Sequence, residues 1–218
     1  MSIKGVIFDI DGVLLDSMEI WEDLGARYLR SLGIEPEEGL AAILFSMSME
    51  QGAAYLAEHY GLTQTPEEVM TGLEAMLRGF YFCEVQAKSG AKDLMERFRK
   101  AGIVMTAATS SPREHVERAL ERNGLLGYLS RIFTVAEAGV SKHSPDIFDA
   151  AAEFMGASRD EVLVFEDSLY ALKTASEAGY HAVGVFDAKG EADQDGLRAC
   201  SEIYIRDPGE FSMQMISS

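Results

Sequence analysis

Hydrophobic positions along this chain follow two patterns, and the patterns alternate from residue 89 onward. Short uninterrupted apolar runs are typical of strands that are buried on both faces of a sheet. Such runs predict strands at 3–8, 103–108, 132–135, 162–165 and 181–185, and a last edge strand at 203–205. Apolar residues at three- and four-residue spacing predict helices at 91–100, 112–123, 145–155 and 169–178. Because strands that alternate with helices form parallel sheets with right-handed crossovers, we expect a Rossmann-like, three-layer α/β core.

The region from 17 to 84 differs, because it contains helical patterns and no strand candidate. Its first helix is predicted by four apolar residues at helical spacing: Trp21, Leu24, Tyr28 and Leu32. Further helices are predicted at 37–48, 49–60 and 66–82, the last with Thr65 as N-cap and Pro66 at its first position. We therefore expect an α/β core from residues 1–16 and 85–218, with residues 17–84 inserted as an all-helical domain.

Composition and charge narrow the range of partners. The chain has 218 residues, of which 47% are hydrophobic, and a formal net charge of −17. This charge argues against nucleic acids and anionic membranes as partners, since both would be repelled. Cys83 and Cys200 are far apart, so neither a disulfide framework nor a zinc site is expected. With no signal peptide and no apolar run long enough to span a bilayer, the sequence favours a soluble, cytoplasmic protein.

Pairs of acidic residues follow two of the predicted strands. Asp9 and Asp11 lie at or just past the end of the first strand, and Glu166 and Asp167 follow the strand at 162–165. The carboxyl ends of parallel strands meet at one edge of a sheet, where ligands bind in α/β folds. Carboxylates that are close together repel each other unless a cation compensates, and Mg²⁺ prefers such oxygen ligands. Either pair alone also fits an ordinary acidic turn, but together they predict a Mg²⁺ site.

Two more polar groups stand between a strand and a helix. Thr109, Ser110 and Ser111 precede the helix predicted at 112, where hydroxyls and free amides suit a phosphate group. Lys142 lies in a short loop before the helix at 145, where its charge would offset phosphate oxygens. Taken singly, the hydroxyls fit an ordinary helix cap and the lysine fits a solvated surface charge. Combined with the acidic pairs, they fit phosphoryl transfer, in which positioning and charge neutralisation dominate.

The four groups together resemble the motif set of the haloacid dehalogenase superfamily. The matching features are DxDGxxxDS from Asp9 to Ser17, the strand ending in Thr109, Lys142 before a Pro-Asp helix start, and Glu-Asp-Ser at 166–168. The resemblance covers essentially the whole chain. The inserted helices are similar to the cap domain of the phosphoglycolate phosphatase and β-phosphoglucomutase branch, which implies that they would close over the site.

This resemblance implies a role for each candidate residue. Asp9 would be the nucleophile that forms an aspartyl-phosphate, and Asp11 the general acid and base. The implied Mg²⁺ ligands are Asp9, the backbone carbonyl of Asp11, Glu166 and Asp167. The implied phosphate-binding groups are Thr109, the Ser110 amide and Lys142, and Lys142 would also hold the nucleophile.

Two departures from β-phosphoglucomutases bear on the reaction. Trp21 stands where those enzymes carry a His, and residues 46–49 offer no base where they carry a cap Arg that grips a second phosphate. Both departures favour a phosphatase that hydrolyses the phosphate monoester of a small metabolite, such as a sugar phosphate. A phosphosugar mutase and a non-catalytic metal-binding module remain the alternatives. The cap residues Trp21, Phe45, Met47 and Met49 either line a pocket for an uncharged leaving group or form the core of the cap.

Overall fold

The computed structural model describes residues 3–45 and 47–217, and the chain divides into two compact units. One unit combines residues 1–17 with 85–218, and the other comprises residues 18–84. All strands of the described chain belong to the first unit, whereas the described residues of the second unit form only helices and the loops that join them. The predicted α/β core with an inserted helical segment is thus confirmed. No helix of the part that the structure describes is both long and apolar enough to cross a membrane.

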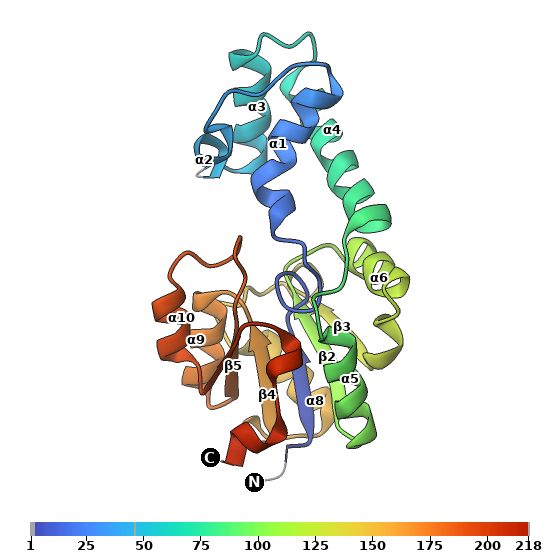
Figure 1. Cartoon of the computed structure of the whole chain (residues 1–218), viewed down its shortest axis with the longest axis vertical. Helices are drawn as coiled ribbons and strands as arrows, with labels where there is room; N and C mark the ends of the chain where they lie inside the picture. The colour runs from blue at the N-terminus through green and yellow to red at the C-terminus, as the bar shows by residue number, and fades with distance from the viewer. Residues whose placement is uncertain (1–2, 46, 218) are drawn as a thin grey trace. The chain divides into compact units, whose positions relative to one another are not determined.

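A single six-stranded parallel sheet forms the centre of the core unit, in the order β3-β2-β1-β4-β5-β6 (Figure 1). The strands are β1 (Gly5–Phe8), β2 (Val104–Thr109), β3 (Arg131–Thr134), β4 (Val162–Glu166), β5 (His181–Val185) and β6 (Ile203–Ile205). The chain builds outward from β1 to β3 on one side and from β4 to β6 on the other. The order therefore reverses between β1 and β4, and ligands bind at such reversal points in open α/β sheets.

The register of β1 and β4 brings the predicted acids to this reversal point. Phe8 is level with Phe165, so the next residues, Asp9 and Glu166, lie side by side at the carboxyl ends of the two strands. The Asp9 amide also donates a hydrogen bond to the Phe165 carbonyl at 2.8 Å, which continues the ladder by one residue. The backbone position of Asp9 is therefore fixed by the sheet, independently of the contacts that its side chain makes.

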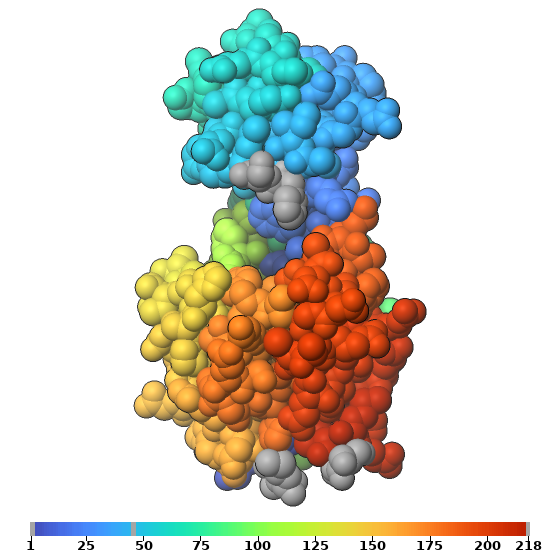
Figure 2. Space-filling model, turned by 90° about the vertical axis from the view of Figure 1, so that its left-hand side faces the viewer, coloured from blue at the N-terminus to red at the C-terminus, as the bar shows by residue number. Residues whose placement is uncertain are grey.

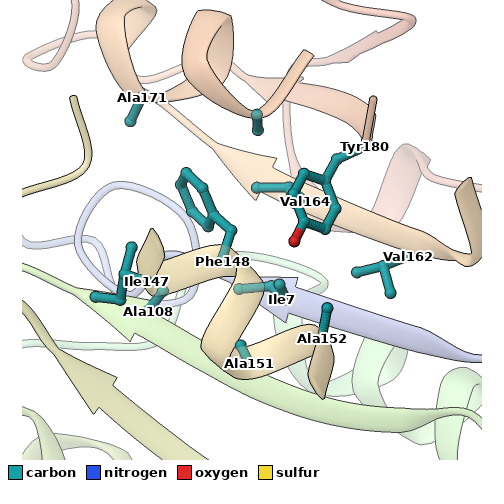
Figure 3. Packing of buried hydrophobic residues seen from close by; sticks show 11 residues of the cluster. Ile7, Ala108, Ile147, Phe148, Ala151, Ala152, Val162, Val164, Ala171 and Tyr180 are labelled. Atoms are coloured by element: carbon teal, nitrogen blue, oxygen red, sulfur yellow. The ribbon is translucent and has the colours of Figure 1, made fainter. Parts of the chain in front are cut away.

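One face of the sheet is covered by α8 (Asp146–Met155) and α9 (Leu169–Ala178) (Figure 3). Ile7 of β1 and Val164 of β4 point toward Phe148 of α8 on this face. The cluster consists of Ile7, Ala108, Ile147, Phe148, Ala151, Ala152, Val162, Val164, Ala171, Ala175 and Tyr180. Many small alanines let α8 approach the sheet closely, and the Tyr180 hydroxyl donates to Asp149 Oδ1 at 2.6 Å, so its polar atom is satisfied.

The opposite face is aromatic. Phe8 and Phe165 follow Ile7 and Val164 in their strands and point the other way, because side chains alternate along a strand. Their ring centroids are 4.9 Å apart. Phe98 of α5 (Ala91–Lys100) and Phe211 near the C-terminus cover them, with centroid distances of 6.1 Å and 5.0 Å to Phe165. Both faces of the sheet are thus covered, which completes the predicted three layers.

The remaining elements of the core agree with the sequence patterns except where they are very short. These elements are α6 (Arg113–Arg122), α7 (Val135–Ala138), α10 (Gln194–Cys200), η2 (Leu126–Tyr128), η3 (Arg159–Glu161), η4 (Pro208–Glu210) and η5 (Met213–Ser217). The helices α7 and α10 were not predicted, because four and seven residues are too few to display a helical period. The helix α10 packs beside α9 on the face shown in Figure 2.

The described residues of the helical unit form four α-helices and a π-helical turn. These are α1 (Glu19–Ser31), α2 (Leu40–Phe45), α3 (Met49–His59), α4 (Pro66–Gly79) and η1 (Phe80–Glu84). Thr65 caps α4 as predicted: its hydroxyl accepts from the Glu68 amide, and the Glu68 carboxylate accepts from the Thr65 amide. The predicted helix 66–82 is instead an α-helix that ends at Gly79 and continues as the π-turn.

The predicted apolar stripe of α1 is only half buried. Leu24 and Tyr28 are buried, and the Tyr28 ring packs so closely on α4 that a Cβ at Gly72 would stand 2.4 Å from it. Trp21 and Leu32, by contrast, are 44% and 37% exposed within the chain. Spacing alone therefore overestimated how far this stripe is covered.

Candidate active site

A buried lysine joins the ends of β1 and β4. Lys142 Nζ lies 2.5 Å from Asp9 Oδ1 and 2.5 Å from Glu166 Oε1. All three side chains are almost fully buried. The loop before α8 thus places a positive charge between two carboxylates from neighbouring strands.

Three carboxylates crowd around this single ammonium group. Asp9, Glu166 and Asp167 each have an oxygen within 4.8 Å of the others, and all three are buried. Lys142 neutralises only one of the three negative charges, so the cluster has an excess of negative charge that a divalent cation would offset. Carboxylate oxygens are also the ligands that Mg²⁺ prefers. Charge and donor type therefore both fit Mg²⁺.

The pKa values of these groups reflect the same crowding. Burial raises the pKa of Asp9 to about 8; the charges of Glu166 and Asp11 add to the rise, and Lys142 opposes it. Burial, followed by the charges of Asp9 and Glu166, also raises the pKa of Asp167. Burial alone would lower the pKa of Lys142, but the two carboxylates beside it raise that pKa, so the ammonium stays charged. Without a cation, the site therefore holds protons that a bound metal would displace.

Glu166 is fixed at both of its carboxylate oxygens. Oε1 accepts from Lys142, and Oε2 accepts from the Ser168 amide at 3.2 Å and the Ser168 hydroxyl at 3.0 Å. This arrangement orients Glu166 toward Lys142. Its carboxylate thus holds the lysine in place as well as adding charge to the cluster.

Asp11 is held by two hydroxyl groups. Ser17 Oγ donates to its Oδ1 and Ser111 Oγ donates to its Oδ2, both at 2.6 Å. Among the described residues its side chain is not part of the three-carboxylate cluster. Asp11 is therefore oriented by hydroxyl donors next to the cluster, which suits a group that exchanges protons with a substrate.

The hydroxyl-rich turn after β2 is built around Thr109. Thr109 is fully buried, and its Oγ1 accepts from the Ser111 amide at 3.0 Å, which shapes the turn before α6. Ser110 is exposed at the tip of this turn and lies beside Tyr170. The Tyr170 ring in turn stacks on His143, with centroids 4.3 Å apart. The structure thus brings Ser110 and the neighbour of Lys142 to the same rim.

A sequence profile of the haloacid dehalogenase-like hydrolases matches residues 3–179, a range that includes every residue of the site just described. The chain belongs to this family. Validoxylamine A 7'-phosphate phosphatase from Streptomyces hygroscopicus subsp. limoneus is 24% identical over 89% of this chain and 92% of its own. Hexitol phosphatase A from Escherichia coli (strain K12) is 28% identical over 85% of this chain and 84% of its own.

A solved structure shows the same fold. The crystal structure of a putative β-phosphoglucomutase from Thermotoga maritima matches with a TM-score of 0.84 at 24% sequence identity. The match covers 95% of this chain and 96% of that one. The predicted haloacid dehalogenase superfamily is confirmed.

The helical unit of this hydrolase contains an apolar hollow of about 190 Å³. Its lining residues are Trp21, Leu24, Gly25, Leu44, Met47, Ser48, Met49, Gly52, Leu56 and Leu73. Trp21, Met47 and Met49 were predicted to line a pocket or to form a core, and in the structure they line this hollow. The side chain of Phe45 and the whole of Ser46 lie outside the described residues. No charged side chain lines the hollow in the described part of the unit.

Sequence reasoning missed the two serines that hold Asp11. Ser17 closes the DxDGxxxDS string and was assigned no role. Ser111 was considered only as part of the hydroxyl group that suits phosphate, so neither serine was predicted to hold Asp11. Serine is common at turns and helix starts, so a hydroxyl aimed at a catalytic carboxylate has no separate sequence signal.

Proposed function

We propose that this hydrolase is a Mg²⁺-dependent phosphatase that cleaves the phosphate monoester of a small uncharged alcohol, such as a sugar or polyol. The phosphoryl group passes through Asp9. The observation that carries the proposal is the buried cluster in which Lys142 bridges Asp9 and Glu166 beside Asp167. Burying several charged side chains together costs free energy of folding. A phosphoryl-transfer site accounts for such a cluster, because it needs a nucleophile beside positive charge that neutralises the phosphoryl oxygens.

In the first step, an Asp9 oxygen attacks phosphorus and forms an aspartyl-phosphate while the bond to the leaving alcohol breaks. Asp11 gives its proton to the departing oxygen. Lys142 holds Asp9 Oδ1 at 2.5 Å, which keeps the carboxylate in a fixed direction. The exposed Ser110 and the turn around Thr109 bind the other phosphoryl oxygens, in line with the resemblance.

In the second step, Asp11 takes a proton from a water molecule that attacks the phosphoryl group. The bond between phosphorus and Asp9 breaks, inorganic phosphate leaves, and both carboxyl groups return to their starting state. Ser17 and Ser111 keep the Asp11 carboxylate in one orientation through both proton transfers.

The residues that would hold Mg²⁺ are Asp9, Asp167 and the Asp11 backbone carbonyl, with Glu166 beside them. When bound, the ion offsets the negative charge of the carboxylates and of the phosphoryl group. Hexitol phosphatase A acts, by its name, on hexitol phosphates, which supports an uncharged polyhydroxyl leaving group.

The test is release of inorganic phosphate from p-nitrophenyl phosphate and from a panel of sugar and polyol monophosphates, in MgCl₂ and in EDTA. We expect release in MgCl₂ only. Replacing Asp9 with Asn should lower the rate by about a thousandfold or more, because the amide cannot act as the nucleophile. Asp93→Asn, which removes the same charge from the exposed face of α5, serves as the matched control.

Two results would argue against this function. Equal rates for the parent protein and Asp9→Asn would exclude Asp9 as the nucleophile. Interconversion of sugar phosphates without net phosphate release would favour the mutase alternative instead.

A further inference from the structure

The loop between β5 and α10 lies against Asp167. A Cβ added at Gly190 of this loop would stand 2.9 Å from Asp167 Oδ2, so a side chain there would displace the carboxylate. Glu191 fastens the same loop to the start of α9, because its Oε2 accepts from the Leu169 amide at 3.0 Å. The loop therefore contacts Asp167 itself and the helix that begins two residues after it.

A buried ion pair holds the beginning of the loop. Lys88 Nζ lies 2.8 Å from Asp187 Oδ2, with side chains 10% and 5% exposed. The same ammonium donates to the Phe186 carbonyl at 2.8 Å. Asp187 Oδ1 accepts from the Lys189 amide at 2.8 Å. Both oxygens of Asp187 are used within the protein, which suits a supporting group better than a metal ligand.

Lys88 is itself anchored to the chain that follows the nucleophile strand. Its amide donates to the Leu14 carbonyl at 2.9 Å, and the Asp16 amide donates to the Gln86 carbonyl at 2.9 Å. The segment 86–88 therefore pairs with the residues just after Asp11. Lys88 thus connects this paired segment with the loop that touches Asp167.

We propose that Lys88 and Asp187 are positioning residues for the metal site. Their ion pair holds the 186–190 loop against Asp167, and the loop directs the Asp167 carboxylate toward Asp9 and Glu166. The inference rests on the proposed function, because it assigns these residues to the same Mg²⁺ site. Lys88 and Asp187 would thus position Asp167 although neither residue belongs to a motif found in the sequence.

A purely electrostatic role makes a different prediction. Asp187 contributes negative charge near Asp167, and Lys88 offsets that charge. If only the field mattered, removing Lys88 would tighten Mg²⁺ binding and removing the Asp187 charge would weaken it. If positioning matters, either change frees the loop and weakens binding.

The experiment is calorimetric titration of MgCl₂ into the full-length parent protein and into Lys88→Met, Asp187→Asn and Gly190→Ala. Lys173→Met, which removes an exposed charge from α9, is the matched control. We expect each of the three variants to bind Mg²⁺ about tenfold more weakly, as is common when a supporting partner of a metal ligand is lost. The control should bind like the parent.

Kinetics provide a second readout, which distinguishes weaker Mg²⁺ binding from simple destabilisation. The Mg²⁺ concentration for half-maximal phosphatase activity should rise by the same factor, while kcat at saturating Mg²⁺ stays close to the parent value. A loss of folded protein would lower kcat at every Mg²⁺ concentration instead. If Lys88→Met does not fold, Gly190→Ala decides between the two roles, because it changes no charge and weakens Mg²⁺ binding only if the position of the loop matters.

Three results would overturn the inference. Mg²⁺ affinities equal to that of the parent, or tighter binding by Lys88→Met with weaker binding by Asp187→Asn, would exclude positioning while leaving the proposed function intact. A parent protein that takes up no Mg²⁺ would overturn the inference and the proposed function together.

Discussion

Replacing Lys142 with Met should destabilise the metal-free protein strongly at neutral pH. Lys142 Nζ lies between Asp9 and Glu166, at 2.5 Å from an oxygen of each, and the side chain is almost fully buried. Met has a similar length but no charge, so the three buried carboxylates would lose their compensating cation. The folded variant would then need to bind one more proton than the parent.

The cost can be worked out from this extra proton. Protonating a carboxyl group of ordinary pKa at pH 7 spans about 3 pH units at ~1.36 kcal/mol each, which gives about 4 kcal/mol. Breaking a buried ion pair from one side costs about 3–5 kcal/mol by general experience, so the two values agree. Because the folded variant binds the additional proton and the unfolded chain does not, its stability rises as the pH falls. At pH 5 the cost should be smaller by about 2.7 kcal/mol.

Urea denaturation followed by circular dichroism, in EDTA at pH 7 and pH 5, measures this difference. Lys173→Met is the control, because it removes an exposed lysine that lies 3.8 Å from Glu177. A loss below about 1 kcal/mol at pH 7, or an equal loss at both pH values, would refute the account of Lys142 as the buried counter-charge.

Three further predictions concern the metal, Asp11 and the helical unit. Burial raises the pKa of Asp9 to about 8, so protons compete with the metal below that pH. The rise in melting temperature on adding MgCl₂ should therefore be larger at pH 8 than at pH 6. Equal rises at the two pH values would contradict this competition. Ser111→Ala removes the hydroxyl that donates to Asp11 Oδ2. It should lower kcat about tenfold while changing the free energy of unfolding by only ~1 kcal/mol. An unchanged kcat would show that Ser111 does not position Asp11 for catalysis. Trp21 is the one tryptophan of the chain and lines the hollow. If the hollow binds the alcohol part of the substrate, a polyol phosphate should change the fluorescence of Asp9→Asn, whereas inorganic phosphate should not; unchanged fluorescence would exclude this use of the hollow.

The core of the fold was predictable because its strands are short, apolar and bounded by glycine-terminated helices. Asp9 and Glu166 could be paired in advance, since two acidic ends of parallel strands share one edge of the sheet. Lys142 was a candidate only in combination, because an isolated lysine in a loop is usually solvated. The structure brings it between the two acids.

Contacts without a local pattern could not be predicted. The pair of Lys88 and Asp187 joins segments that are distant in sequence, and neither residue stands in a recognisable motif. The hydroxyls of Ser17 and Ser111 were hidden by the frequency of serine at turns. Trp21 fits the apolar stripe of α1, but residue spacing does not reveal that its side chain is partly exposed whereas Leu24 on the same stripe is buried.

The central claim is that Asp9 carries the phosphoryl group, and trapping that group tests it most directly. Asp11→Asn should still accept the phosphoryl group from p-nitrophenyl phosphate, whose leaving group needs little protonation, but should hydrolyse the intermediate slowly. Acid quenching followed by peptide mass spectrometry should then find one additional phosphoryl group on the peptide that contains Asp9, and none in Asp9→Asn. A phosphoryl group on another residue, or an unlabelled Asp9 in a protein that releases phosphate, would contradict the account.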